Sequence, residues 1–272
     1  MPSNSDKDRQ LYLEKIKVYK DAIDVIIKWE TEALESLDPE DTGSSAISKR
    51  FKLVEKMLDA TSYYVILNSI SQSTLKKINE DALGDARKFL TKGLGYLEDL
   101  VSHYVDAPFS DYDDKISLLV DISVAKRYAL IRKLGLTIML FKSSFRDDSK
   151  WKWTFVEIDG RFAAVTKNLF DFKKINENTT HGSPNYAVSM YHLKLLKRLL
   201  NDAADRYRER YEMSTNHTDD FEASLNFMKA LRRIHIILNE AHEAEIIKKK
   251  LDVWEAKLKA DMLKKEEEKA NS

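Results

Sequence analysis

The sequence predicts an all-α protein: a bundle of about six to seven long amphipathic helices, mostly antiparallel, with a long C-terminal helix. Glycine and proline are scarce, with 7 and 4 copies in 272 residues, whereas the residues typical of long helices, Leu, Lys, Glu, Asp and Ala, are abundant. Apolar side chains also recur at alternating spacings of three and four, the period of a helix with one buried face. Because 43% of the residues are hydrophobic, the chain can bury the core of one large domain or two small ones.

The first half of the chain is expected to form four helices separated by polar loops. The first carries an apolar stripe that is interrupted at Glu30, and the third contains Gly93 and Gly95. Two glycines in one turn weaken a helix, so we expect them to let another helix approach closely. The expected helices cover residues 6–36, 47–79, 81–104 and 116–141.

The polar, charged stretch Lys142–Lys152 is a candidate domain boundary. It divides the chain into an N-terminal helical half, residues 1–145, and a C-terminal half, residues 146–272, although both halves can also form one continuous domain.

Residues 151–172 are compatible with two structures. Trp151, Trp153 and Phe155 alternate as in a strand, and Asp159-Gly160 could form a hairpin turn. Apolar residues from Phe155 to Phe172 nevertheless recur at spacings of three and four without a miss, which favours a helix. In that helix Gly160 would be a point of close packing.

The C-terminal half ends in two further expected helices. The first begins at Ser183-Pro184, and the second begins near Thr218 and reaches almost to the C-terminus. Late in the second helix an apolar stripe on a Lys- and Glu-rich background is typical of a coiled-coil seam. We therefore predict a partner-binding seam formed by Leu251, Trp254, Leu258 and Met262.

Composition disfavours several classes of function. Basic and acidic residues both number 45, so no net charge attracts nucleic acid or an anionic membrane. Cysteine is absent, which excludes disulfides, thiolate metal sites and a cysteine nucleophile. The first ten residues lack the apolar core of a signal peptide, and five charges interrupt residues 116–141. We expect a cytoplasmic protein that binds neither nucleic acid nor membrane.

One segment resembles the magnesium-binding motif of the terpene synthases. Asn201, Asp205 and Glu209 place three oxygen ligands four residues apart, although the family has Ser or Thr where Asp205 stands. The resemblance implies a divalent metal and a diphosphate ligand. At 100° per residue, however, the three side chains point away from the apolar arc of their helix, which favours a solvated face with intrahelical ion pairs.

Other charged residues are candidates for an anion site or a metal site. Arg206 and Arg210 flank the apolar arc of the same helix and would bind phosphate or carboxylate if they were buried together. The pattern favours charged ends that reach solvent over a pair that is buried with an acid. His235 and His242 stand seven residues apart, which is too far for one ion to be held from one helix. No cofactor and no metal site are predicted.

Lys126-Arg127-Tyr128, after an acidic loop that contains proline, resembles a short part of the 14-3-3 phosphopeptide adaptors. The resemblance implies phosphate binding by basic residues from two helices, yet the chain has no basic residue between Met57 and Thr74. That absence leaves the phosphate pocket incomplete.

These observations favour a non-enzymatic helical interaction or scaffold protein that contacts a protein partner or a second copy of itself, as part of a larger assembly. The alternative is a helical-bundle enzyme or adaptor that binds a phosphate or diphosphate ligand with a divalent metal.

Overall fold

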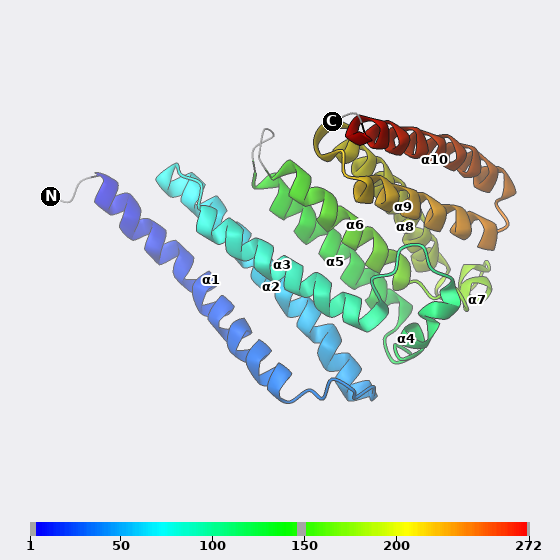
Figure 1. Ribbon diagram of the computed structural model, residues 1–272. Coiled ribbons are helices and arrows are strands. Elements are labelled where there is room, and N and C mark those ends of the chain that lie inside the picture. The colour runs from blue at the N-terminus through cyan, green and yellow to red at the C-terminus, as the bar shows by residue number, and fades with distance from the viewer. Residues whose placement is uncertain (1–3, 146–150, 271–272) are drawn as a thin grey trace. The chain divides into compact units, whose positions relative to one another are not determined.

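The computed structural model describes residues 4–145 and 151–270, and within these ranges every regular element is helical (Figure 1). The all-α prediction is confirmed, and the ten α-helices slightly exceed the expected six to seven. None of the helices in the described ranges combines the length and the apolar character needed to cross a lipid bilayer. The α-helices are α1 (Asn4–Glu35), α2 (Ser44–Leu75), α3 (Glu80–Val101), α4 (Asp113–Ser117), α5 (Val124–Ser143), α6 (Lys152–Asn168), α7 (Ile175–Thr179), α8 (Tyr186–Arg210), α9 (Thr218–Ile237) and α10 (Ala241–Ala270).

The additional helices arise largely because two expected helices are broken. The helix expected over residues 116–141 is split into α4 and α5, and the Ser123 side chain caps α5 by accepting a hydrogen bond from the Lys126 amide. The last expected helix is split into α9 and α10 at residues 238–240, where Asn239 adopts a left-handed backbone conformation with φ of 57°. The chain therefore reverses direction, and α10 packs against α9.

The chain forms two compact units. One comprises Met1–Ser102 and Asp113–Lys152, and the other comprises His103–Tyr112 and Trp153–Ser272. Residues 103–112 thus belong to the second unit although they lie between helices of the first.

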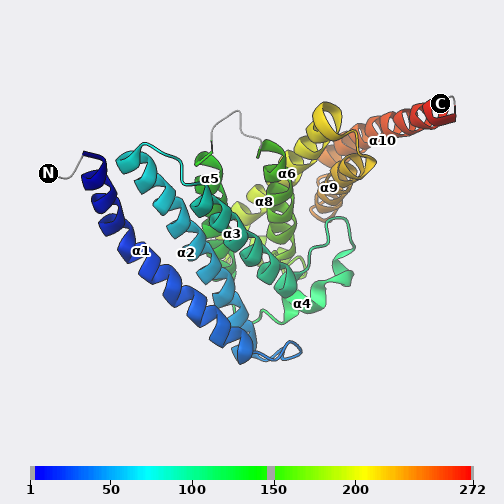
Figure 2. The same cartoon turned by 60° about the vertical axis from the view of Figure 1, so that its left-hand side comes forward.

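In the first unit α2 runs antiparallel to α1 and to α3, and it contacts α1, α3 and α5 (Figures 1 and 2). The contact between α2 and α3 is close at Gly93, where a Cβ atom would lie 3.2 Å from the Cβ of Met57. The close approach expected for Gly93 is confirmed.

Glu30, which interrupts the apolar stripe of α1, is a buried acid with two partners. Its carboxylate accepts hydrogen bonds of 3.0 Å from the ammonium group of Lys92 and of 2.7 Å from the hydroxyl of Tyr96. Burial of the phenol, with the neighbouring Glu30 carboxylate, raises the pKa of Tyr96. The interruption is therefore a satisfied polar group between α1 and α3.

In the second unit the uncertain segment is helical, and the hairpin alternative for residues 151–172 is excluded by α6. Its Gly160 faces α8 and α9, because a Cβ atom there would lie 2.7 Å from the Tyr207 ring and 3.2 Å from Phe227. The two rings stack with centroids 5.5 Å apart, so neither can easily retreat. Gly160 is a point of close packing, as expected.

Gly160→Ala is expected to lower the free energy of unfolding by up to about 2 kcal/mol, because overpacking costs about 1–3 kcal/mol and the better helix propensity of alanine returns about 1 kcal/mol. Urea unfolding followed by circular dichroism measures the change. Gly84→Ala is the matched control, since a Cβ atom there meets nothing within 4 Å and should be neutral or stabilising. Equal effects of the two substitutions would contradict the packing argument.

Candidate interaction site

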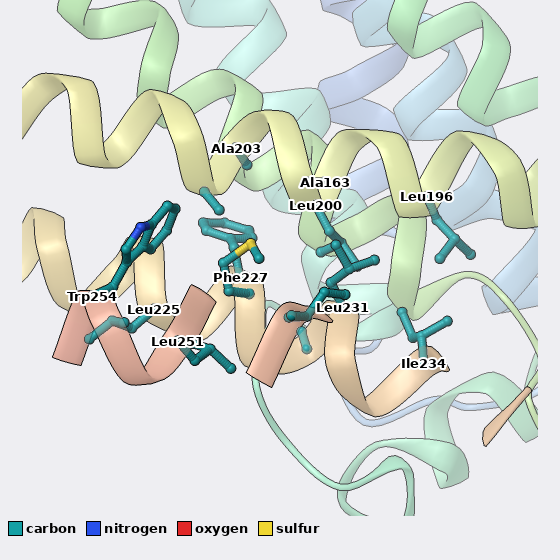
Figure 3. Packing of buried hydrophobic residues seen from close by; sticks show 14 of the residues in the cluster. Ala163, Leu196, Leu200, Ala203, Leu225, Phe227, Leu231, Ile234, Leu251 and Trp254 are labelled. Atoms are coloured by element: carbon teal, nitrogen blue, oxygen red, sulfur yellow. The ribbon is translucent and has the colours of Figure 1, made fainter. Parts of the chain in front are cut away.

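The inner face of α10 carries the predicted partner-binding seam and packs within its own unit. Leu251, Trp254 and Leu258 are buried in one core cluster with residues of α8 and α9, whereas Met262 is 42% exposed (Figure 3). The chain thus covers most of this seam itself, because the turn at residues 238–240 folds α10 back onto α9. Among the four predicted residues only Met262 is exposed.

Aromatic and charged contacts hold α10 against α8, α9 and the turn between them. The Trp254 ring meets Phe221 edge to face at 6.3 Å, and the guanidinium group of Arg208 lies 4.9 Å from the centroid of the Trp254 ring. Further along, the Tyr211 hydroxyl donates a 2.9 Å hydrogen bond to Asp261. The inner face of α10 is therefore anchored over several helical turns.

The opposite face of α10 carries a second apolar stripe, here called the outer stripe. All its members are exposed, and Val253 is 67% exposed. Its residues occupy a and d positions of successive heptads, the pattern that a partner helix covers in a coiled coil, except that the charged Lys249 holds the d position after Ile246. The outer stripe consists of Ile246, Val253, Ala256, Ala260 and Leu263.

A shallow groove, here called the end groove, adjoins the outer stripe near the C-terminal end of α10. It has a volume of about 280 Å³ and apolar walls from Leu225, Leu258, Met262 and Leu263. Leu263 belongs to both surfaces, so the outer stripe and the end groove are continuous. Charged residues at the edge of the groove, Glu255, Lys259 and Glu266, give it a polar rim.

A stripe on α1 offers a comparison. Leu11, Val18 and Val25 are exposed and lie seven residues apart, as the a positions of heptads would. The corresponding d positions are Glu14, Asp21 and Lys28, all charged. This stripe lacks half of a coiled-coil seam, whereas the outer stripe of α10 has apolar residues at both a and d from Val253 to Leu263.

The two arginines considered for anion binding are not buried together. Arg206 is exposed, whereas Arg210 forms an ion pair with Asp220, donates a hydrogen bond to the Trp153 carbonyl and lies 4.8 Å over the Tyr207 ring. Asp220 is thus the acid that the sequence could not identify. With Arg210 neutralised by Asp220, the pair offers no joint anion site.

The residues that resemble a magnesium motif interact with other side chains of the chain. Asn201 donates a 3.1 Å hydrogen bond to Asp205, whose other carboxylate oxygen accepts a 3.0 Å bond from Lys250 of α10. In the ranges that the structure describes, no three His, Asp or Glu side chains are placed to hold one metal ion.

The histidines of α9 and α10 are likewise separate. His235 is buried and contacts the Glu240 carboxylate at 2.5 Å, and Lys197 of α8 bonds the same carboxylate at 2.6 Å. Burial disfavours ionisation of Glu240, but the bonds from Lys197 and His235 outweigh it and lower its pKa. His242 is exposed.

Lys197 and Glu240 line a groove of about 450 Å³ with Tyr186, Met190 and other residues of the second unit.

Arg127, from the segment that resembles the 14-3-3 adaptors, is buried and binds backbone carbonyls. Its guanidinium group donates hydrogen bonds of 2.9 Å to Ile122 and 2.5 Å to Leu119. It therefore fixes the turn before α5 and does not face solvent as a phosphate ligand would.

The sequence profile of the TP0443 family matches residues 8–262. No curated protein and no solved structure matches the chain.

Proposed function

We propose that this chain, which belongs to the TP0443 family, is a helical interaction protein that associates with a second copy of itself through α10. The observation that carries the proposal is the outer stripe, a run of apolar a and d positions on a helix whose opposite face is already buried. A helix needs one apolar face to pack in its own unit, so the second one needs a different explanation.

The size and composition of the outer stripe suit a helix as its occupant. From Ile246 to Leu263 it extends about 26 Å at 1.5 Å per residue, a length over which two helices can pack. Ala256 and Ala260 keep its centre small, which allows a second backbone to come close. The exposed Met262 and Leu263 can extend the contact into the end groove.

The charges beside the outer stripe favour a parallel second copy. Glu245 and Asp252 occupy g positions, while Lys250 and Lys257 occupy e positions. In a parallel pair each acid would face a lysine of the other copy, although Lys250 and Lys257 also bind Asp205 and Asp261 of their own chain. The next pair along the seam would place Lys259 against a like charge. In an antiparallel pair the e-position lysines would face one another, which is repulsive.

Val253→Asp is expected to weaken self-association at least about a hundredfold, because a carboxylate would be buried without a partner at the centre of the seam. Sedimentation velocity over a micromolar concentration series measures the change. Since Val253 is exposed, the unfolding curve of the variant should match that of the unaltered chain.

The matched control is Val18→Asp on α1, where an equally exposed valine lies on a stripe with charged d positions. This variant should associate as the unaltered chain does. An unaltered chain that stays monomeric throughout the series, or a Val253→Asp variant that still associates normally, would rule out the proposed seam.

A further inference from the structure

The groove of about 450 Å³ in the second unit, here called the lysine groove, has the size and composition of a ligand site. Its volume lies within the range of about 300–1,000 Å³ that is typical of small-molecule sites. Its lining residues come from α7, α8 and the turn between α9 and α10, all within the second unit. They include the apolar Met190, Leu193 and Leu238 and the polar Tyr186, Lys194, Lys197 and Glu240.

Lys197 is held in place at the polar side of the lysine groove. Its ammonium group donates hydrogen bonds of 2.7 and 2.6 Å to the two carboxylate oxygens of Glu240, which His235 also contacts at 2.5 Å. Because a lysine ammonium has three N–H donors, Lys197 retains one for a further acceptor. The bonds to Glu240 therefore fix a donor beside the groove and neutralise its charge.

Lys194 adds a positive charge that is not neutralised. It is exposed, lies three residues before Lys197 on α8, and forms no hydrogen bond or ion pair with the residues that the structure describes. Side chains at this spacing are neighbours, with Cβ atoms about 5–6 Å apart, so the two ammonium groups can share one carboxylate. With Lys197 neutralised by Glu240, the excess of one positive charge suits a monoanion better than a phosphate dianion.

The apolar side of the lysine groove suits an alkyl chain. Leu193 is buried in the core cluster of the second unit, and Leu238 packs against that cluster, so both have fixed surroundings. Met190 is 42% exposed and has a flexible, unbranched side chain that can adapt to a bound chain. An alkyl chain on this surface would remove exposed apolar area from water.

We propose that the lysine groove binds a monocarboxylate with an alkyl chain, such as a medium-chain fatty acid. The carboxylate binds between Lys194 and Lys197, and the alkyl chain lies over Met190, Leu193 and Leu238. The site is independent of the self-association proposed for α10.

The end groove of α10 provides an internal comparison, because it is apolar without an excess of positive charge. Its rim has one lysine, Lys259, and two acids, of which Glu255 pairs with Lys229 at 3.0 Å. Met262 lines the end groove and is as exposed as Met190, at 42% each. The two methionines therefore report on apolar surfaces that differ in charge.

The test titrates the full chain, labelled with ¹³C at its methionine methyl groups, with octanoate and follows the NMR resonances. The Met190 resonance is expected to shift and to saturate at millimolar octanoate, whereas Met262 and the strongly exposed Met213 should shift little. Octyltrimethylammonium, with a similar chain and a positive head group, should bind at Met190 at least about fivefold more weakly. The proposal is overturned if Met190 responds equally to both probes, responds no more than Met262, or does not respond to about 10 mM octanoate.

Two variants locate the carboxylate. Lys194→Gln removes the charge that has no partner and should weaken octanoate binding severalfold, with an unchanged unfolding curve because the residue is exposed. Lys259→Gln, at an exposed lysine of the end groove, is the matched control and should leave the affinity at Met190 unchanged. Unchanged octanoate binding in Lys194→Gln would overturn the placement of the carboxylate.

Discussion

Trp254→Ala is expected to lower the free energy of unfolding by about 3–5 kcal/mol, the usual cost of truncating a buried aromatic side chain to alanine. The Trp254 ring is 4% exposed and touches Phe221 in the core shared by α8, α9 and α10 (Figure 3). The guanidinium group of Arg208 and the ammonium group of Lys250 lie over the same ring and would lose that contact. Urea unfolding followed by circular dichroism measures the loss.

The neighbouring Val253 provides the control, because it is 67% exposed on the other side of α10. Val253→Ala should change the free energy of unfolding by less than about 0.5 kcal/mol. If Trp254→Ala were as stable as Val253→Ala and lost only self-association, Trp254 would belong to a docking seam, as its spacing alone predicts.

The sequence could predict that Trp254 has to be covered but not what covers it. Spacings of three and four show which side of a helix is apolar and leave its neighbour undefined. The neighbour here is α9, and it is reached through a turn that contains neither glycine nor proline. Asn239 was the one local signal, since asparagine can adopt the left-handed conformation that ends a helix.

The break between α4 and α5 was missed for a similar reason. The apolar spacing continues across residues 118–123, so periodicity alone joins the two helices. Ser123 could have been recognised as a cap, because its side chain accepts the Lys126 amide hydrogen. Gly160 and Gly93, in contrast, were correctly assigned to close packing, because the cost of glycine inside a helix calls for a local reason.

The polar pairs of the second unit could not be predicted from local patterns. Arg233 and Asp106 are 127 residues apart in sequence, and Lys167 and Tyr112 are 55 apart. Neither pair follows a helical spacing or a motif, since each depends on how residues 103–112 pack in the second unit. The position of Arg210 beside the apolar arc favoured a charged end that reaches solvent, whereas it pairs with Asp220, which lies across the turn between α8 and α9.

The difference in unfolding free energy between Lys167→Met and the unaltered chain should be more favourable to the variant at pH 6–7 than at pH 10. Methionine fills a similar volume without a charge to desolvate, whereas the lysine must be buried as an ammonium ion at low pH. The substitution also leaves the buried Tyr112 hydroxyl without its hydrogen-bond partner, which costs about 1–3 kcal/mol at every pH.

The sign of the pH dependence follows from the lowered pKa of Lys167, about 7 in the folded chain against 10.5 as its ordinary value. Between these values the unfolded chain holds a proton on this amine that the folded chain has released, so the folded state gains stability as the pH rises. Below pH 7 both states are protonated and the full penalty applies. The penalty removed by Lys167→Met is on the order of 5 kcal/mol there and fades as the pH rises from 7 to 10.5.

The measurement is the difference in unfolding free energy between Lys167→Met and the unaltered chain from pH 6 to pH 10, since other titrating groups cancel in that difference. Lys194→Met, at an exposed position of α8, should show a difference that does not vary with pH. A difference for Lys167→Met that is equally flat would mean that the amine keeps its proton in the folded chain. Tyr112 and Asp106 would then stabilise the ammonium ion well enough to offset both its burial and the repulsion from Arg233.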